Sequence, residues 1–99
     1  MNSRVYILTY TTGDPEDSPR IDIFRLRHSA IEKIFQEIEE EYDDESLEKE
    51  ITDWCIARKF NGKITLEEVK SIVESHLLAT GRVEDFYGGS YLLESHRLQ

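Results

Sequence analysis

Residues 21–38 read IDIFRLRHSAIEKIFQEI, and the spacing of their apolar side chains changes part of the way along. Over 21–27 apolar and polar residues largely alternate, which is typical of a half-buried β-strand. From position 30 onward the apolar residues recur every three to four positions, the period of an amphipathic helix. Ser29 and Glu32 have the spacing of a capping box, in which each side chain binds the other residue's backbone N–H. The stretch therefore predicts a strand over 21–27 and a helix over about 30–42.

The residues before this stretch predict another strand and a loop that joins the two. Residues 4–11, RVYILTYT, are rich in β-branched and aromatic side chains, and both faces of the expected strand carry apolar residues. Residues 12–19, TGDPEDSP, hold both prolines and are dense in turn-forming residues. We therefore expect an antiparallel hairpin in which 4–11 is a central strand.

Two more helices are expected after residue 45. A helix over about 46–59 would place one set of side chains on a single face: Leu47, Ile51, Trp54, Cys55 and Arg58. Asn61-Gly62 can terminate this helix, because both residues tolerate the left-handed conformation. Thr65 and Glu68 form a second capping box, which predicts a helix over about 66–78 that ends at Gly81.

The remaining residues complete an α+β fold. Residues 82–89, RVEDFYGG, are expected to form a loop or a short irregular strand, and 90–98, SYLLESHRL, the last strand. The order β-β-α-α-α-β predicts one domain over residues 1–99. We expect a small antiparallel sheet of about three strands, with 4–11 between 21–27 and 90–98, and three helices packed on one face.

The negative charge of the chain is concentrated in one segment. The net charge is −9, and residues 37–50, EIEEEYDDESLEKE, hold nine of the 21 acidic residues but only one basic residue, Lys49. Such a surface repels phosphate backbones and anionic membranes, so direct nucleic-acid binding and membrane binding are not expected. The single cysteine, Cys55, cannot form an internal disulfide, which favours a reducing compartment and a cytoplasmic location.

Residues 57–68 resemble the second half of an EF-hand calcium loop. Asn61, Gly62 and Glu68 match the fifth, sixth and twelfth positions of such a loop. The first and third positions, which require oxygen ligands, are Ala57 and Lys59. Because a Gly terminator followed by a capping box explains the same residues, we expect no metal site here.

No arrangement of nucleophiles or histidines predicts an enzyme. His28, His76 and His96 lack the short spacing of a metal-binding pair, so structural roles are expected for them. Cys55 lies on the apolar face of its predicted helix, where burial disfavours the reactive thiolate. We therefore expect a protein without enzymatic activity and without a cofactor.

The acidic segment is the candidate functional site. Carboxylates at the C-terminal end of a helix oppose its dipole, and acids spaced three or four residues apart repel each other. Local stability would favour lysine at these positions, so the acids suggest a surface that receives a basic protein. The alternative is that they form a solvated helix end. The partner-binding residues predicted on this basis are Glu37, Glu40, Glu41, Tyr42, Asp43, Asp44, Glu45 and Glu48.

In its size, acidity and α+β layout the whole chain resembles small acidic accessory proteins encoded by phages and mobile elements, such as anti-CRISPR proteins. This resemblance implies an inhibitor that presents carboxylates to the basic, nucleic-acid-binding site of a host defence or nuclease complex. It assigns no role to any particular residue. The alternative is a homodimer or larger homo-oligomer that forms through a strand edge or an apolar patch, with the acidic segment merely solvated.

The absence of oxygen ligands at Ala57 and Lys59 predicts that the loop around Asn61-Gly62 does not bind calcium. Isothermal titration of the protein with calcium at about millimolar concentration should show no saturable heat. A dissociation constant in the range of calcium sensors, about 10⁻⁷–10⁻⁵ M, would contradict this prediction.

Overall fold

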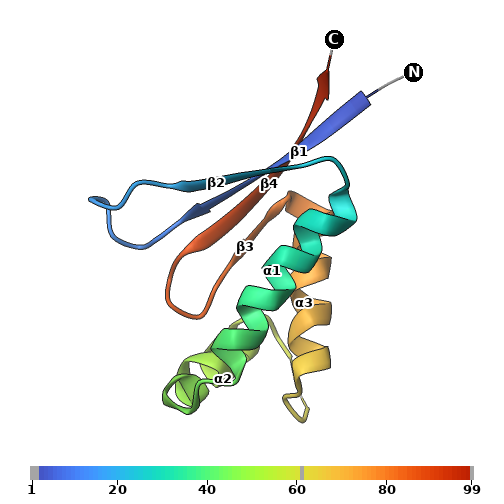
Figure 1. Ribbon diagram of the computed structural model, residues 1–99. Coiled ribbons are helices and arrows are strands. Elements are labelled where there is room, and N and C mark those ends of the chain that lie inside the picture. The colour runs from blue at the N-terminus through green and yellow to red at the C-terminus, as the bar shows by residue number, and fades with distance from the viewer. Residues whose placement is uncertain (1–2, 61, 99) are drawn as a thin grey trace.

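The computed structural model describes residues 3–60 and 62–98, and it has the predicted α+β architecture (Figure 1). A strand hairpin comes first, followed by three helices and then two more strands. In chain order the elements are β1 (Ser3–Thr11), β2 (Arg20–Phe24), α1 (Arg27–Tyr42), the short 3-10 helix η1 (Glu45–Leu47), α2 (Glu48–Ala57), α3 (Leu66–Thr80), β3 (Arg82–Glu84) and β4 (Ser90–Leu98).

The sheet is antiparallel throughout and has four strands in the order β2-β1-β4-β3. The first hairpin strand lies between its partner and the last strand, as predicted, and the sheet has one strand more than the three or so expected. The additional strand, β3, pairs along the outer side of β4, with Val83 opposite Tyr91. It falls within residues 82–89, where the sequence allowed a short irregular strand.

Helix α1 begins three residues earlier than predicted. Leu26 is its N-cap, in extended conformation, and the Leu26 carbonyl accepts a hydrogen bond of 3.4 Å from the Ala30 amide. No side chain caps this end of the helix, so the predicted capping box of Ser29 and Glu32 is absent. Because β2 already ends at Phe24, the chain turns directly into the helix and Ser29 lies within its first turn.

The ends of the other helices agree more closely with the sequence. The Thr65 side chain accepts a hydrogen bond of 3.2 Å from the Glu68 amide at the start of α3, and Gly81 ends α3 with φ of 74°. After α2, Lys59 adopts the left-handed conformation, with φ of 61°. The sequence indicated Asn61-Gly62 for this role, and Asn61 lies outside the described residues.

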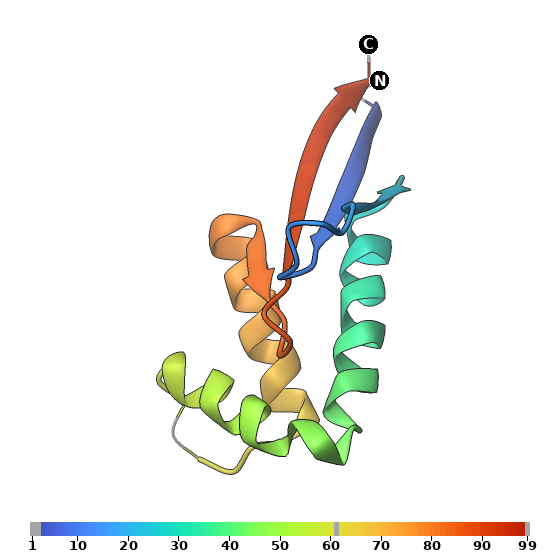
Figure 2. The same ribbon diagram turned by 90° about the vertical axis from the view of Figure 1, so that its left-hand side faces the viewer.

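The core lies between the inner face of the sheet and the helices. Helix α2 crosses beneath the lower ends of α1 and α3, so all three helices contribute to one apolar layer (Figure 2). The Trp54 indole donates a hydrogen bond of 3.0 Å to the Glu84 carbonyl and packs edge-on against Phe86. The buried apolar side chains are Leu8, Ala30, Ile34, Ile38, Leu47, Ile51, Trp54, Cys55, Val69, Val73, Leu77, Val83, Phe86 and Tyr91.

Two features of the arrangement affect the surface. The ends of β1 and β4 that hold Ser3 and Leu98 extend beyond the helices as a two-stranded ribbon (Figures 1 and 2). None of the helices in residues 3–60 and 62–98 combines the length and the hydropathy needed to cross a bilayer.

The structure predicts that Cys55 reacts slowly. Its side chain is only 1% exposed, and burial raises the pKa of its thiol, although the charge of Arg58 opposes that shift. Ellman's reagent should therefore modify the native protein more than about tenfold more slowly than the protein in denaturant, because reaction requires local opening. Equal rates in the two states would place the thiol at the surface.

Candidate acidic interface

All eight predicted partner-binding residues line one of two neighbouring hollows at the lower end of α1. The first, here called the tyrosine hollow, has a volume of about 350 Å³ and is lined by Tyr10, Arg20, Glu37, Glu40, Glu41, Tyr87 and Tyr91. The second, here called the turn hollow, has a volume of about 420 Å³ and is lined by Tyr42, Asp43, Asp44, Glu45, Glu48, Ile51, Thr52, Gly62 and Ile64. The acidic segment is therefore a recessed surface rather than a smooth helix end.

The turn hollow combines carboxylates with an apolar floor. Four acidic residues from the end of α1, from η1 and from the start of α2 lie around it, together with the buried Ile51 and the half-buried Ile64. The Tyr42 hydroxyl donates a hydrogen bond of 3.3 Å to the Ile64 carbonyl and so connects α1 to the segment before α3. Such a recess suits lysine or arginine, whose long apolar stem carries a cation at its end.

Asp44 joins the two hollows. Its carboxylate accepts hydrogen bonds from the Ser46 hydroxyl at 2.7 Å, from the Ser46 amide at 3.0 Å and from the Tyr87 hydroxyl at 3.2 Å. The bonds from Ser46, and to a lesser extent that from Tyr87, lower the pKa of the Asp44 carboxyl. Asp44 therefore stays ionised, and part of its hydrogen-bonding capacity is already used in starting η1.

In the tyrosine hollow one arginine neutralises part of the acidic charge. The Arg20 guanidinium lies 2.6 Å from one oxygen of Glu37 and 2.8 Å from the other, and it stacks over the ring of Tyr10 at 5.3 Å. Glu37 is therefore committed to an ion pair within the protein. Burial raises the pKa of both Tyr10 and Tyr91, so these phenols remain protonated.

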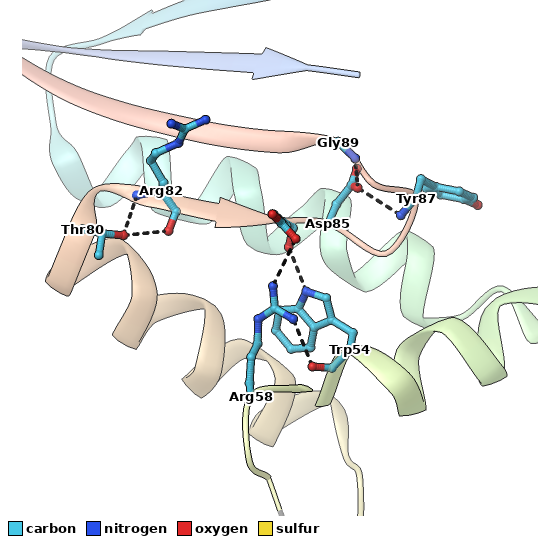
Figure 3. A network of polar contacts seen from close by, with 8 residues as sticks. Trp54, Arg58, Thr80, Arg82, Asp85, Tyr87 and Gly89 are labelled. Carbon is cyan, nitrogen blue, oxygen red and sulfur yellow. Dashed lines mark hydrogen bonds and ion pairs between the residues drawn. The ribbon is translucent and has the colours of Figure 1, made fainter. Parts of the chain in front are cut away.

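The carboxylate of Asp85 is buried beneath the tyrosine hollow, with the residue only 3% exposed. One oxygen accepts hydrogen bonds from the amides of Tyr87 at 3.0 Å and Gly89 at 2.7 Å, which closes the turn between β3 and β4 (Figure 3). The other oxygen accepts a hydrogen bond from the Tyr10 hydroxyl of β1. A side chain at Gly89 would put a Cβ 2.5 Å from that hydroxyl oxygen, so only glycine fits there.

Glu41 lies beside Asp85 and is not the solvated carboxylate that its position in the acidic segment suggested. Its Oε2 atom is buried and accepts no hydrogen bond. Burial first, then the charge of Asp85 and a hydrogen bond to it, and finally the charge of Glu37 raise the pKa of Glu41 to about 8. Near neutral pH Glu41 is therefore mostly protonated and can donate its proton to Asp85.

Asp85 was missed from the sequence, where residues 82–89, RVEDFYGG, indicated a loop or a short irregular strand. An aspartate side chain in a turn commonly accepts a hydrogen bond from the backbone amide two residues on, as Asp85 does from Tyr87, and this signal was available. Nothing in the sequence indicated that the turn folds against Tyr10 and Glu41, because these residues are far apart in the chain.

The three histidines do not come together in one site. His28 pairs with Glu32 at 3.2 Å on α1, His96 pairs with Glu94 at 3.5 Å on β4, and His76 lies near Arg58 and Arg82. Figure 3 shows Arg58 beneath β3, where it stacks over the Trp54 ring at 4.1 Å and donates to the Trp54 carbonyl. Within residues 3–60 and 62–98 no three His, Cys, Asp or Glu side chains form a group that could hold a metal ion.

Comparison of the chain with protein-family models, with curated protein sequences and with solved structures found no match.

The raised pKa of Glu41 predicts a pH-dependent stability. Between about pH 4.5, where a free glutamate ionises, and about pH 8, the folded protein binds this proton more strongly than the unfolded chain. The free energy of unfolding should therefore fall as the pH rises through this range. In Glu41→Gln the fall should be shallower, and at pH 8–9 this variant should be more stable than wild type by on the order of 1 kcal/mol, after allowing for solvent screening.

Urea denaturation at five pH values between 5 and 9 gives the free energy of unfolding at each pH. The difference between wild type and Glu41→Gln in the slope of this free energy against pH isolates the contribution of Glu41. Glu40→Gln is the matched control, because Glu40 is adjacent in sequence but exposed. If Glu41→Gln and Glu40→Gln change the pH profile equally, Glu41 does not hold the proton.

Proposed function

We propose that this protein is a non-enzymatic binding module whose two acidic hollows receive the basic surface of another protein. The observation that carries the proposal is the gathering of all eight candidate residues around these hollows, one of which has an apolar floor. Carboxylates alone add little affinity at the rim of an interface, whereas a recess that also contacts the stem of a basic side chain can anchor it.

A nucleic-acid-binding site is the kind of basic surface that fits best. Lysine and arginine side chains placed for phosphates would meet Asp43, Glu45 and Glu48 around the turn hollow, and the net charge of −9 would speed the encounter. By the resemblance to phage-encoded accessory proteins, the protein would act as an inhibitor of a host defence or nuclease complex. A cytoplasmic location fits this role and the single unpaired Cys55.

The acidic residues differ in how free they are to bind a partner. Glu37 is paired with Arg20, Glu41 adjoins Asp85, and Asp44 starts η1. Four other acids lie exposed around the hollows and have none of these roles within the described residues: Glu40, Asp43, Glu45 and Glu48. We propose that these four supply most of the electrostatic attraction, with the others holding the recess in shape.

A homo-oligomer, with the acidic segment merely solvated, is the second candidate function. The observation that favours it is the exposure of Ile21 and Ile23 on the sheet, at 61% and 67%. This surface lies away from the acidic hollows, so homo-oligomerisation by itself leaves the hollows open to a partner.

The test replaces Glu40, Asp43, Glu45 and Glu48 by Gln or Asn in one variant. The matched control neutralises four exposed acids elsewhere, Glu16, Asp53, Glu67 and Glu74, so that both variants change the net charge by the same amount. Proteins captured from host cells on wild type and on each variant are identified, and binding kinetics are measured with the purified partner. We expect the first variant to associate at least about tenfold more slowly at low salt, and the control to resemble wild type.

Two further observations should accompany this loss. Added salt should slow association of the wild type, because screening weakens exposed charges, and single-stranded DNA should compete with the protein for the partner. If both fourfold variants bind like wild type, or if DNA and the protein bind the partner together, the acidic surface does not occupy a nucleic-acid site.

A further inference from the structure

The face of the sheet that points away from the helices carries a set of exposed apolar side chains, and here it is called the outer face. Side chains alternate along a strand, so the pairing of the strands decides which residues share this face. Ile7 lies opposite Ile23, and Thr9 lies opposite both Ile21 and Leu92. The apolar residues of the outer face are Val5, Ile7, Ile21, Ile23, Leu92 and Leu98.

No element within residues 3–60 and 62–98 covers this face. The core forms on the opposite side of the sheet, where Leu8 and Tyr91 pack against residues of α1 and α3. In Figure 2 the strands lie side by side, and the helices flank the lower part of the sheet. Ile23 is 67% exposed and Leu98 54% exposed. Val5, Ile7 and Leu92 are half-buried, so the exposed apolar surface centres on Ile21, Ile23 and Leu98, and exposed apolar clusters often mark contact sites.

We propose that the outer face is the contact surface of a weak, reversible homodimer. A second copy is the occupant that the distribution of charge favours. Each chain carries −9, so two copies repel each other most where their acidic segments approach. The outer face bears a small net charge, because Arg82 offsets part of the charge of Glu84 and Glu94, and Glu94 lies 3.5 Å from His96.

The geometry of the sheet fits a twofold-symmetric contact. Thr9 of β1 lies between Ile21 of β2 and Leu92 of β4, near the middle of the sheet, so a twofold axis near Thr9 would set the two central strands against their own copies. The tyrosine and turn hollows open on the helix side of the sheet, because Tyr10, Arg20 and Tyr91 alternate with the outer-face residues. Dimerisation would therefore leave both acidic surfaces free and would present two of them in one particle.

The area sets the strength of the contact. The four strands hold 9, 5, 3 and 9 residues, and at about 3.3 Å per residue and about 4.8 Å per strand they present a face of roughly 400 Å². Two such faces bury about 800 Å², below the roughly 1,200–2,000 Å² of stable complexes. A contact this small is expected to be weak, and the experiment is designed for a dissociation constant on the order of 10 µM.

The experiment is sedimentation velocity of the purified chain from about 1 to about 500 µM, a range that brackets this dissociation constant. We expect wild type to shift from monomer to dimer, and Ile23→Glu to raise the dissociation constant at least tenfold. Ile56→Glu is the matched control, because Ile56 on α2 is 62% exposed and receives the same charge. The control should dimerise like wild type, and thermal melts should confirm that both variants fold.

Three outcomes would overturn the proposal. Wild type could remain monomeric up to about 500 µM, which is far above the expected dissociation constant. Ile23→Glu could dimerise as well as wild type and the Ile56→Glu control. Hydrogen exchange could show that dimerisation protects the outer-edge amides of β2, which would indicate pairing of strand edges instead of contact between faces. None of these results bears on partner binding at the acidic hollows. That proposal is tested with the fourfold variants, which leave every apolar residue of the outer face unchanged.

Discussion

A buried carboxylate ties the turn between β3 and β4 to the first strand of the sheet. Asp85 comes from the turn between β3 and β4, and its donors come from that turn and from Tyr10 on β1. A charge removed from water is stable only when its hydrogen bonds are satisfied, so each donor is required. The fit of the β3–β4 turn against Tyr10, and the requirement for glycine at position 89, both follow from this, whereas the backbone pairing of β1 with β4 positions the strands.

The same carboxylate changes how the acidic segment should be understood. A count of residues gives each acid between 37 and 50 a full negative charge. Next to Asp85, Glu41 retains a proton near neutral pH, and Glu37 shares its charge with Arg20. The field outside the protein therefore comes mainly from the exposed acids, which include Glu40, Asp43, Glu45 and Glu48. The lower end of α1 thus has an inner part that stabilises the fold and an outer part that faces solvent.

The sequence predicted those parts of the fold that depend on local pattern. The period change after residue 27, the apolar stripes of the helices, the Thr65 cap and the Gly81 terminator are all visible within a few residues of chain. The missed features depend on tertiary contacts. The sequence left a loop or a short strand open for residues 82–89, and there β3 pairs with β4. Helix α1 starts early because β2 ends at Phe24, and Lys59 adopts the left-handed conformation after α2. The acidic site was predicted as a segment, but its division into two hollows required Tyr10, Tyr87 and Ile64 from distant elements.

The two-stranded ribbon at the ends of β1 and β4 has a practical consequence for handling the protein. Ser3 and Leu98 are opposite each other in the sheet, at the end farthest from α2 (Figure 1). A tether joined to either end of the described chain would therefore leave from the same point and direct the lower end of α1 away from a solid support. Orientation on a biosensor chip, or in a fusion with a reporter domain, is thus set by the fold itself and is the same for both ends.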